Sequence, residues 1–497
     1  MTGRADHVLQ NPTALVGLLV AGQIVAWTLA PTLTHVVPPL DIVEGYLWGR
    51  EWVIATYKHP ALPSWVLEAT RILTGAVGWP AYLVSQLFVA ATFLFVYLLG
   101  CDLMGRQRAA AGTLLLTGIV YYSWPTPEFN HNVAQTMFWA GFAWALWRAV
   151  ERRSLWWWIL LGIFGAGGIY AKLSTGLLFL AAAAWIALDA RARRSLANVG
   201  PWITLALIVT AAAPLGLWLV ETDFAMLRYA ADRTHWSKPE GVQTFVLSAL
   251  GTFAGMLPIL AIGGLIGLRW NPADGQPAAL APIDPRAVRF LAVLVAIPPL
   301  LVVVAALLTR SGLKAAWASP MFNLVGLLAV ALTVHRFDAR ALRRIAIVAL
   351  TLVIVIPVAY GIAIAVPVRA KQPLRVQWPG PEIAERMAGI WDRSTQGAPL
   401  RIVAGENWIA GLVGLRHKDR PHLLSNANML HSPWIDPRQL EAEGMLVLWD
   451  DEKAPIDLHS YINAHTQLWQ LEIFRSPRSR RDIRIRYIVV PPKPLPR

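Results

Sequence analysis

Two carboxylates open the first dense cluster of ionisable residues in this chain. Asp41 and Glu44 are three residues apart in the stretch LDIVEGYLWGREWVIATYKHPALPSW, residues 40–65. If residues 43–52 form a short helix on a membrane surface, both carboxylates lie on one helix face. Carboxylates beside an apolar body can differ in pKa, as general-base catalysis on a hydroxyl group requires. The alternative is that Asp41 caps this helix and Glu44 stabilises its first turn.

The second half of this stretch contains groups suited to binding an anion. Tyr57 is followed by Lys58 and His59, and two prolines, Pro60 and Pro63, restrict the backbone that carries them. Polar groups held rigidly at a membrane edge suit recognition of an anionic headgroup. The alternative for Lys58 is a side chain that only extends toward water.

The composition indicates that these residues belong to a membrane protein. The 497-residue chain is 56% hydrophobic and 15% charged, and it has 24 Trp. Its single cysteine, Cys101, excludes an intramolecular disulfide framework. The net charge of +14 could suggest nucleic acid, but in a membrane protein an arginine excess more often reflects cytoplasmic loops and anionic lipid. We therefore expect membrane lipid, and no nucleic acid, among its partners.

Apolar windows predict about eleven membrane-spanning helices, since crossing ~30 Å of hydrocarbon takes ~20 apolar residues. The first window is long and has no Ala-x-Ala-like site at its end, so we expect an anchor and not a cleaved signal. The windows are residues 13–33, 80–100, 108–124, 132–150, 155–170, 173–189, 200–220, 243–268, 287–309, 319–335 and 343–367.

The arginines predict the orientation, because Lys and Arg are retained on the cytoplasmic side. They cluster in alternate short loops, at residues 106–108, 148–153, 191–194, 269–286 and 336–344. This pattern predicts a cytoplasmic N-terminus. Residues 40–65 and the C-terminal segment are then expected on the outer side.

The composition becomes mixed polar and apolar from residue 368 onward. We therefore predict a transmembrane domain over 1–367 and a soluble α/β domain over 368–497. Hydrophobic patterns and turn residues predict strands at 400–405, 445–450, 468–474 and 483–490, and helices at 406–415 and 436–444. The predicted fold class is mostly α: a polytopic helical bundle with amphipathic outer-loop helices and a C-terminal α/β domain.

The first outer loop resembles a known family, the GT-C superfamily of polytopic glycosyltransferases. Its bacterial branch is related to protein O-mannosyltransferases and to the transferases that put aminoarabinose or galacturonic acid on lipopolysaccharide. That branch has an acidic residue, a short helix with WGREW, and then Tyr-Lys-His-Pro-Pro-Leu-x-x-Trp. The match is close over about 26 residues and loose over the first 370 or so. The matching positions are Asp41, Glu44, Trp48 to Trp52, Tyr57, Lys58, His59, Pro60 and Trp65.

Two positions depart from the family pattern. Ala61 stands where the family usually has a second proline. Ile42 follows Asp41, so an adjacent Asp-Glu pair is absent.

The resemblance implies an activity. A sugar would pass from a polyprenyl-phosphate donor to an acceptor hydroxyl at the outer face, by one inverting displacement without a covalent sugar-enzyme intermediate. Asp41 would be the catalytic carboxylate, with Glu44 as the second one. The expected acceptor is lipid A, lipopolysaccharide or another envelope glycolipid or glycan, and the expected location is the bacterial inner membrane, with the C-terminal domain periplasmic.

Further polar side chains at outer helix ends are candidate ligands of the donor phosphate or sugar. Lys172, in GGIYAKLSTG, resembles a Lys-containing turn of the family; a lone Lys between apolar helices is costly unless it faces water or an anion. His131, in PEFNHN, could bind a sugar hydroxyl or belong to an ordinary helix cap. Arg233 could clamp a phosphate from a lid-like loop, and Lys314 could bind the carrier phosphate.

Motifs for nucleotide and metal chemistry are absent from the sequence. It has no Gly-x-x-x-x-Gly-Lys-Ser/Thr phosphate loop, which fits a pre-activated donor. The outer loops have no tight run of carboxylates, so we expect no cofactor and no catalytic metal.

Two alternatives remain at the level of sequence. Many helices with outer cations are compatible with a transporter or flippase of a lipid-linked precursor, although transporters place ionisable groups near the bilayer midplane. A protein Ser or Thr could also be the acceptor.

Overall fold

The computed structural model describes residues 11–236, 242–266, 282–309, 311–366, 373–451, 468–475 and 481–493. The chain forms two compact units, neither of which is continuous in sequence. The first, here called the helical unit, comprises residues 1–30, 82–127 and 131–360. The second, the α/β unit, comprises residues 31–81, 128–130 and 361–497. The first outer loop therefore groups with the C-terminal segment, and the proposed boundary at 367 stays a prediction.

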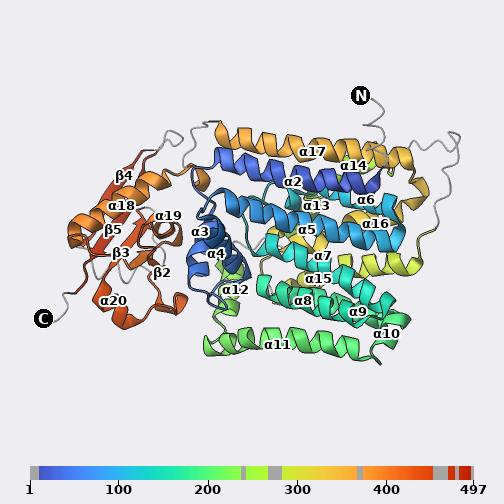
Figure 1. Ribbon diagram of the computed structural model, residues 1–497, viewed down its shortest axis with the longest axis horizontal. Helices are drawn as coiled ribbons and strands as arrows, with labels where there is room; N and C mark the ends of the chain where they lie inside the picture. The colour runs from blue at the N-terminus through green and yellow to red at the C-terminus, as the bar shows by residue number, and fades with distance from the viewer. Residues whose placement is uncertain are drawn as a thin grey trace. The chain divides into compact units, whose positions relative to one another are not determined.

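The helical unit consists of helices joined by short turns (Figure 1). Each predicted apolar window contains one or more helices, and the ends of the windows 243–268 and 343–367 lie outside the described residues. The elements are α2 (Pro12–Thr34), α5 (Trp79–Met104), α6 (Arg106–Leu114), η1 (Leu115–Gly118), η2 (Val120–Tyr122), α7 (His131–Arg152), α8 (Leu155–Ala171), α9 (Thr175–Leu188), α10 (Ala190–Ser195), α11 (Val199–Glu221), α12 (Ala225–Trp236), α13 (Val242–Gly251), α14 (Met256–Ile262), α15 (Pro285–Thr309), η3 (Ala315–Phe322), α16 (Val325–Leu332), η4 (Val334–Arg336) and α17 (Ala339–Ala365).

Five helices in the described part of the chain are long and apolar enough to cross a membrane: α2, α5, α11, α15 and α17. The pair α13 and α14, bent by 41°, makes a sixth if it is one span, and α8 and α9 are shorter apolar helices. The chain is thus a multi-pass membrane protein. The predicted number of about eleven membrane-spanning helices is not confirmed, because several of the predicted windows fold as short or broken helices.

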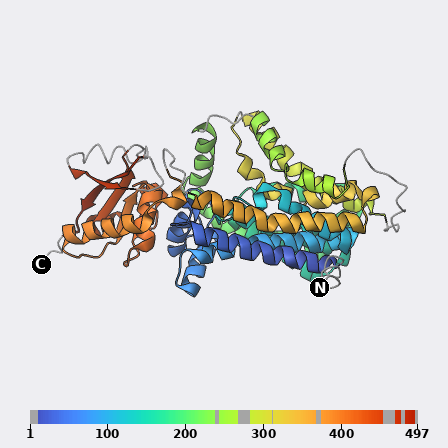
Figure 2. The same ribbon diagram turned by 90° about the horizontal axis from the view of Figure 1, so that it is seen from above.

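Glycines allow the helices of this unit to pack closely. A Cβ at Gly162 of α8 would lie 2.8 Å from Leu207 of α11, and one at Gly167 would lie 2.2 Å from Phe138 of α7. Helix α8 is therefore held between α7 and α11. Figure 2 shows α2 and α17 running side by side, and a Cβ at Gly22 of α2 would lie 3.0 Å from Val353 of α17. Such small residues let helix backbones approach in a membrane, where packing replaces the hydrophobic effect.

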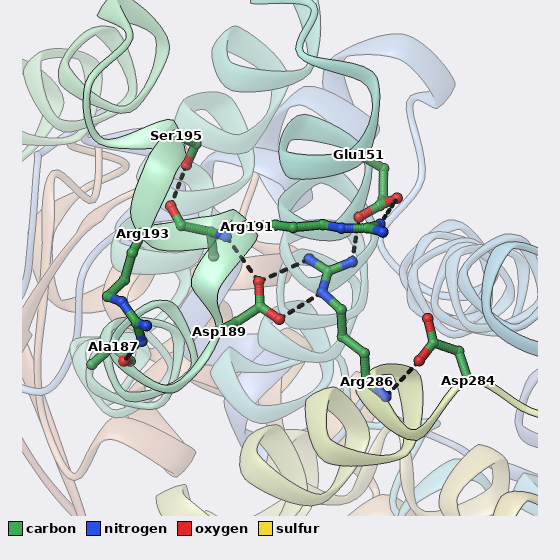
Figure 3. A network of polar contacts seen from close by, with 9 residues as sticks. Glu151, Ala187, Asp189, Arg191, Arg193, Ser195, Asp284 and Arg286 are labelled. Atoms are coloured by element: carbon green, nitrogen blue, oxygen red, sulfur yellow. Dashed lines mark hydrogen bonds and ion pairs between the residues drawn. The ribbon is translucent and has the colours of Figure 1, made fainter.

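An ionic network joins three helices at one end of the helical unit (Figure 3). Arg286, in the first turn of α15, forms a two-pronged ion pair with Asp189, with N–O distances of 2.6 and 3.0 Å, and a third contact with Glu151 at the end of α7. Its guanidinium also lies 4.5 and 5.4 Å from the ring centroids of Trp147 and Trp185. Because Asp189 caps α10 as well, one buried arginine fixes α7, α10 and α15 relative to each other.

The α/β unit contains the predicted C-terminal elements, together with a helix and a strand, α18 and β2, that the sequence did not predict. Its elements are α3 (Leu40–Arg50), α4 (Leu62–Thr74), η5 (Arg375–Gln377), α18 (Gly380–Thr395), β1 (Ile402–Gly405), α19 (Asn407–Arg416), β2 (His422–Ser425), η6 (Met429–His431), α20 (Pro437–Glu443), β3 (Met445–Asp450), β4 (Gln470–Phe474) and β5 (Ile483–Val490).

The five strands form one mixed sheet in the order β2-β1-β3-β5-β4. The first three strands are parallel, and β5 runs antiparallel to β3 and β4. Helices α18 and α19 cover one face, with Trp391 and Trp408 in the core, and α20 covers the other, where Trp449 is buried (Figure 1). The chain crosses from β2 over β1 to β3, so the topology reverses beside the carboxyl end of β1, where open α/β sheets place ligands.

Helices α3 and α4 pack tightly through two glycines spaced four residues apart. A Cβ at Gly45 would lie 2.4 Å from Leu67, and one at Gly49 would lie 2.2 Å from the Ser64 carbonyl oxygen. On its other side, α3 places Val43 and Leu47 in the core beneath α19. The helix that carries the candidate carboxylates is therefore rigidly held.

Candidate active site

A tight turn between α3 and α4 presents Tyr57 and Lys58. The Thr56 amide donates to the His59 carbonyl at 2.9 Å, and the Thr56 hydroxyl accepts from the amides of Lys58 and His59 at 3.3 Å. Ala55 and Pro60 form an isolated bridge at the base of this turn. The proline that the sequence singled out thus closes the turn that carries the cation.

Lys58 pairs with Glu44. The Lys58 ammonium donates to Glu44 Oε1 at 2.6 Å, and it lies 5.3 and 5.6 Å from the ring centroids of Trp48 and Tyr57. The Glu44 side chain is 2% exposed and that of Lys58 is 16% exposed. A buried carboxylate held by a cation is poorly placed to accept a proton from an acceptor, so the pair favours Glu44 as the residue that holds Lys58 in position.

The C-terminal segment completes the surroundings of Glu44. Asn407, the first residue of α19, donates through Nδ2 to Glu44 Oε1 at 2.8 Å and to the Tyr57 hydroxyl oxygen at 3.3 Å. The Tyr57 ring stacks on His431 with centroids 3.8 Å apart. Gly405, with φ +112°, ends β1 just before Asn407; a Cβ there would lie 1.9 Å from the Leu448 carbonyl oxygen, so only glycine fits.

A second carboxylate pair forms around Asp41. Asp41 lies in the first turn of α3, whose N-cap is Pro39, so the alternative in which Asp41 caps this helix is wrong. Its Oδ2 accepts from Asn130 Nδ2 at 2.9 Å, and its backbone amide donates to Glu128 Oε1 at 3.0 Å. The PEFNHN motif thus supplies two direct contacts to the predicted catalytic residue.

Both carboxyl groups hold protons more tightly than usual. Burial raises the pKa of Asp41, and the neighbouring Glu44 raises it further; Lys58 acts in the opposite direction. Burial and then the charge of Asp41 raise the pKa of Glu128 to about 7. Two carboxyl groups this close do not readily ionise together, which is the situation in which one of them serves as a base near neutral pH.

The other predicted ligands lie in the helical unit, except for His59. Lys172 lies in the turn between α8 and α9, where its ammonium donates to Asn132 Oδ1 at 2.6 Å and lies 5.9 Å from the centroid of the Trp317 ring. Lys314 directly precedes η3, and His131 is the first residue of α7.

The structure adds little about two of the predicted donor ligands, His59 and Arg233. His59 contributes its carbonyl oxygen to the turn around Lys58. Arg233 falls within α12, and its side chain lies outside the described residues.

Metal binding was predicted to be absent and stays a prediction. In the described ranges, no group of three or more His, Cys, Asp or Glu side chains is arranged to hold a metal ion. The carboxylates of Asp41 and Glu128 instead have nitrogen donors as partners.

Sequence reasoning missed Asn407, His431 and Arg375, all of which come from the C-terminal segment. Arg375 lies close enough to lower the pKa of both Asp41 and Glu128. One signal was available for Asn407: a polar pair, Glu406 and Asn407, directly follows a buried strand that ends in glycine. No local pattern links that pair to a loop more than 300 residues earlier.

Part of the chain resembles a known protein family in sequence. Residues 58–218 match the sequence family described as dolichyl-phosphate-mannose-protein mannosyltransferase. No curated protein matches the chain in sequence.

Solved structures share the fold over nearly the whole chain. ArnT from Cupriavidus metallidurans bound to undecaprenyl phosphate has a TM-score of 0.62 and 14% identity, over 97% of this chain and 98% of its own. The same protein in the apo state has a TM-score of 0.62 and 13% identity, over 96% and 98%. The arabinofuranosyltransferase AftD from Mycobacteria has a TM-score of 0.54 and 14% identity, over 96% of this chain and 40% of AftD. Part of the chain therefore resembles a mannosyltransferase family in sequence, and the whole chain shares its fold with the glycosyltransferases ArnT and AftD.

Proposed function

We propose that the chain transfers a sugar from a polyprenyl-phosphate donor to a hydroxyl group of an envelope glycolipid, at the periplasmic face of a bacterial inner membrane. The observation that carries the proposal is the arrangement of a carboxylate with a raised pKa, Asp41, on the same short helix as Glu44, the carboxylate that holds Lys58. The fold supports the choice of donor, since ArnT was solved with undecaprenyl phosphate.

In this mechanism Asp41 is the base. The acceptor oxygen bonds to the anomeric carbon as the bond from that carbon to the donor phosphate oxygen breaks. The phosphate leaves with the electron pair, and the acceptor proton moves to the Asp41 carboxylate. One displacement of this kind inverts the configuration at the anomeric carbon. A base with a raised pKa takes the proton more readily than an ordinary aspartate, provided that it is ionised at the working pH.

Lys58 binds the leaving phosphate and needs no acid beside it, because phosphate is already a good leaving group that requires positive charge. Glu44 holds its ammonium in place, and Asn407 holds Glu44, because Lys58 Nζ and Asn407 Nδ2 both donate to Glu44 Oε1. Asn407 Nδ2 also donates to the Tyr57 hydroxyl oxygen. Lys172, Lys314, Arg233, His131, His59 and Tyr57 remain proposed ligands of the donor.

The proposal is tested with membranes that contain the Asp41→Asn variant and a radiolabelled polyprenyl-phosphate sugar. Transfer should fall by about 10²–10⁴-fold, the usual contribution of a positioned base, while expression and thermal stability stay near wild type. The matched control is Asp482→Asn, an exposed aspartate. Near-normal transfer by the Asp41 variant would show that another group is the base.

A second candidate acceptor is a protein Ser or Thr, favoured by one observation: the matched sequence family is described as a protein mannosyltransferase. Extraction of the radiolabelled products into lipid and protein fractions separates the two. Label in the lipid fraction supports the glycolipid acceptor, and label confined to protein overturns it.

A further inference from the structure

A cluster of arginines lies in the α/β unit apart from the Lys58 turn. Arg50 ends α3, Arg71 lies in the last turn of α4, and Arg420 lies between α19 and β2. With Tyr46 they line a single small cavity of about 20 Å³ that is partly open to solvent. Three guanidinium groups around one cavity are costly to bring together without negative charge.

One buried carboxylate, that of Glu68, pairs with two of the three arginines. Glu68, whose side chain is 3% exposed, accepts from Arg71 through Nε at 2.9 Å and Nη2 at 2.8 Å. Arg420 Nη2 donates to both oxygens of the same carboxylate, at 3.0 and 3.1 Å. The hydrogen bonds of both arginines lower the pKa of Glu68, so it is ionised at neutral pH. These three side chains therefore carry one net positive charge before Arg50 is counted.

Arg50 adds a second positive charge. Its guanidinium forms no hydrogen bond or ion pair with any other described residue, and its Nη1 is buried. Burial lowers the pKa of Arg50; the charge of Glu51 acts in the opposite direction, and the charge of Arg420 lowers the pKa further. Glu51 forms no direct ion pair with Arg50, and its carboxylate contacts His422 Nδ1 at 2.8 Å.

Tyr46 supplies a neutral donor on the wall of the same cavity. The residue is 2% exposed, and its hydroxyl is buried without a hydrogen-bond partner among the described residues. Burial raises the pKa of Tyr46, so the phenol keeps its proton and is able to donate. A buried donor without an acceptor is costly. The cavity thus has two unused donors, from Tyr46 and Arg50, and an excess of positive charge.

We propose that this cavity binds a phosphate group, with the Arg50 guanidinium and the Tyr46 hydroxyl as hydrogen-bond donors and with Arg71 and Arg420 supplying charge. A tetrahedral phosphate offers several acceptor oxygens, and the planar fork of an arginine matches two of them. We assign this phosphate to the acceptor glycolipid, an assignment that rests on the proposed function, in which the donor phosphate pairs with Lys58. The site would select acceptors that carry a phosphate group.

Calorimetric titration of the purified full-length chain in dodecyl maltoside tests the site. The probes are dodecyl phosphate, a lipid phosphate, and inorganic phosphate. Tyr46→Phe and Arg50→Gln should each weaken dodecyl phosphate binding by about 10-fold or more. Arg438→Gln, which removes an exposed arginine, should leave binding at this cavity unchanged.

The outcomes separate the possibilities. Binding that is equal in wild type, Tyr46→Phe and Arg50→Gln would overturn the site, and Tyr46→Phe keeps the test decisive if Arg50→Gln fails to fold. Equal affinity for both probes would overturn the assignment to a lipid acceptor in favour of free phosphate. The titration needs no turnover, so a chain that binds phosphate through Tyr46 and Arg50 but transfers no sugar would refute the proposed function and keep the site.

Discussion

Replacing Glu128 with Gln should change how the stability of the folded chain depends on pH. Glu128 Oε1 accepts the backbone amide of Asp41, and a Gln amide oxygen can accept the same bond. The substitution therefore keeps the contact and removes the ionisable group. Burial and the charge of Asp41 give Glu128 a pKa of about 7 in the folded chain.

The magnitude follows from the difference between that pKa and the ordinary one. Between the ordinary value of 4.5 and about 7, the folded chain holds a proton that the unfolded chain releases. The wild-type free energy of unfolding therefore falls as pH rises through this window, by on the order of 3 kcal/mol at 1.36 kcal/mol per pH unit. In Glu128→Gln this contribution disappears, so the variant gains stability relative to wild type as pH rises from 5 to 8.

The assay is chemical denaturation of wild type and Glu128→Gln in mild detergent at pH 5, 6, 7 and 8. Glu385→Gln, which removes an exposed carboxylate of α18, is the matched control and should parallel wild type. Parallel stability curves for wild type and Glu128→Gln would refute the assignment of a raised pKa to Glu128.

Three other substitutions have expected outcomes. Lys58→Met leaves a buried carboxylate without its cation and should lower the free energy of unfolding by about 3–5 kcal/mol; a denaturation midpoint equal to wild type would contradict the buried pair. Asn407→Ala removes a hydrogen bond to that carboxylate and should lower the free energy of unfolding by about 1.5–3 kcal/mol. The apparent affinity for the donor in transfer assays should also weaken. If both the stability and the affinity were unchanged, the Asn407 amide would not position Glu44. Arg286→Lys loses a two-pronged ion pair and the contacts with two Trp rings, so its thermal midpoint should fall. Arg191 is exposed and lies 3.4 Å from the carboxylate of Glu151, so the control variant Arg191→Lys should shift the thermal midpoint little. Equal shifts in the Arg286 and Arg191 variants would contradict a stabilising role for the ionic network around Arg286.

The local part of the site could be predicted from the sequence. Asp41, Glu44 and Lys58 lie in one continuous stretch, and their spacing on a short helix and a proline-bounded turn is a local property. The predicted strands and helices of the C-terminal segment were confirmed for the same reason, because alternation, capping residues and glycines act over a few positions.

The long-range part could not be predicted. No pattern in the sequence shows that Asn407 contacts Glu44, or that Glu128 accepts the Asp41 amide, because both contacts depend on how segments far apart fold onto α3. The number of spans was not confirmed for a related reason: hydropathy detects apolar length, but it does not show where a helix breaks, as happens between α13 and α14.

The contact between Glu44 and Asn407 also has a consequence for biosynthesis. The two residues are 363 positions apart, and a ribosome adds roughly 5–20 residues per second, so Asn407 is made roughly 20–70 s after Glu44. During that interval the Lys58 turn and α3 exist without the amide that fixes their carboxylate. A chain that stops before β1 lacks Asn407 and cannot assemble this part of the site, even if its membrane helices fold correctly. The arrangement around Glu44 therefore depends on a segment that is synthesised 363 positions later.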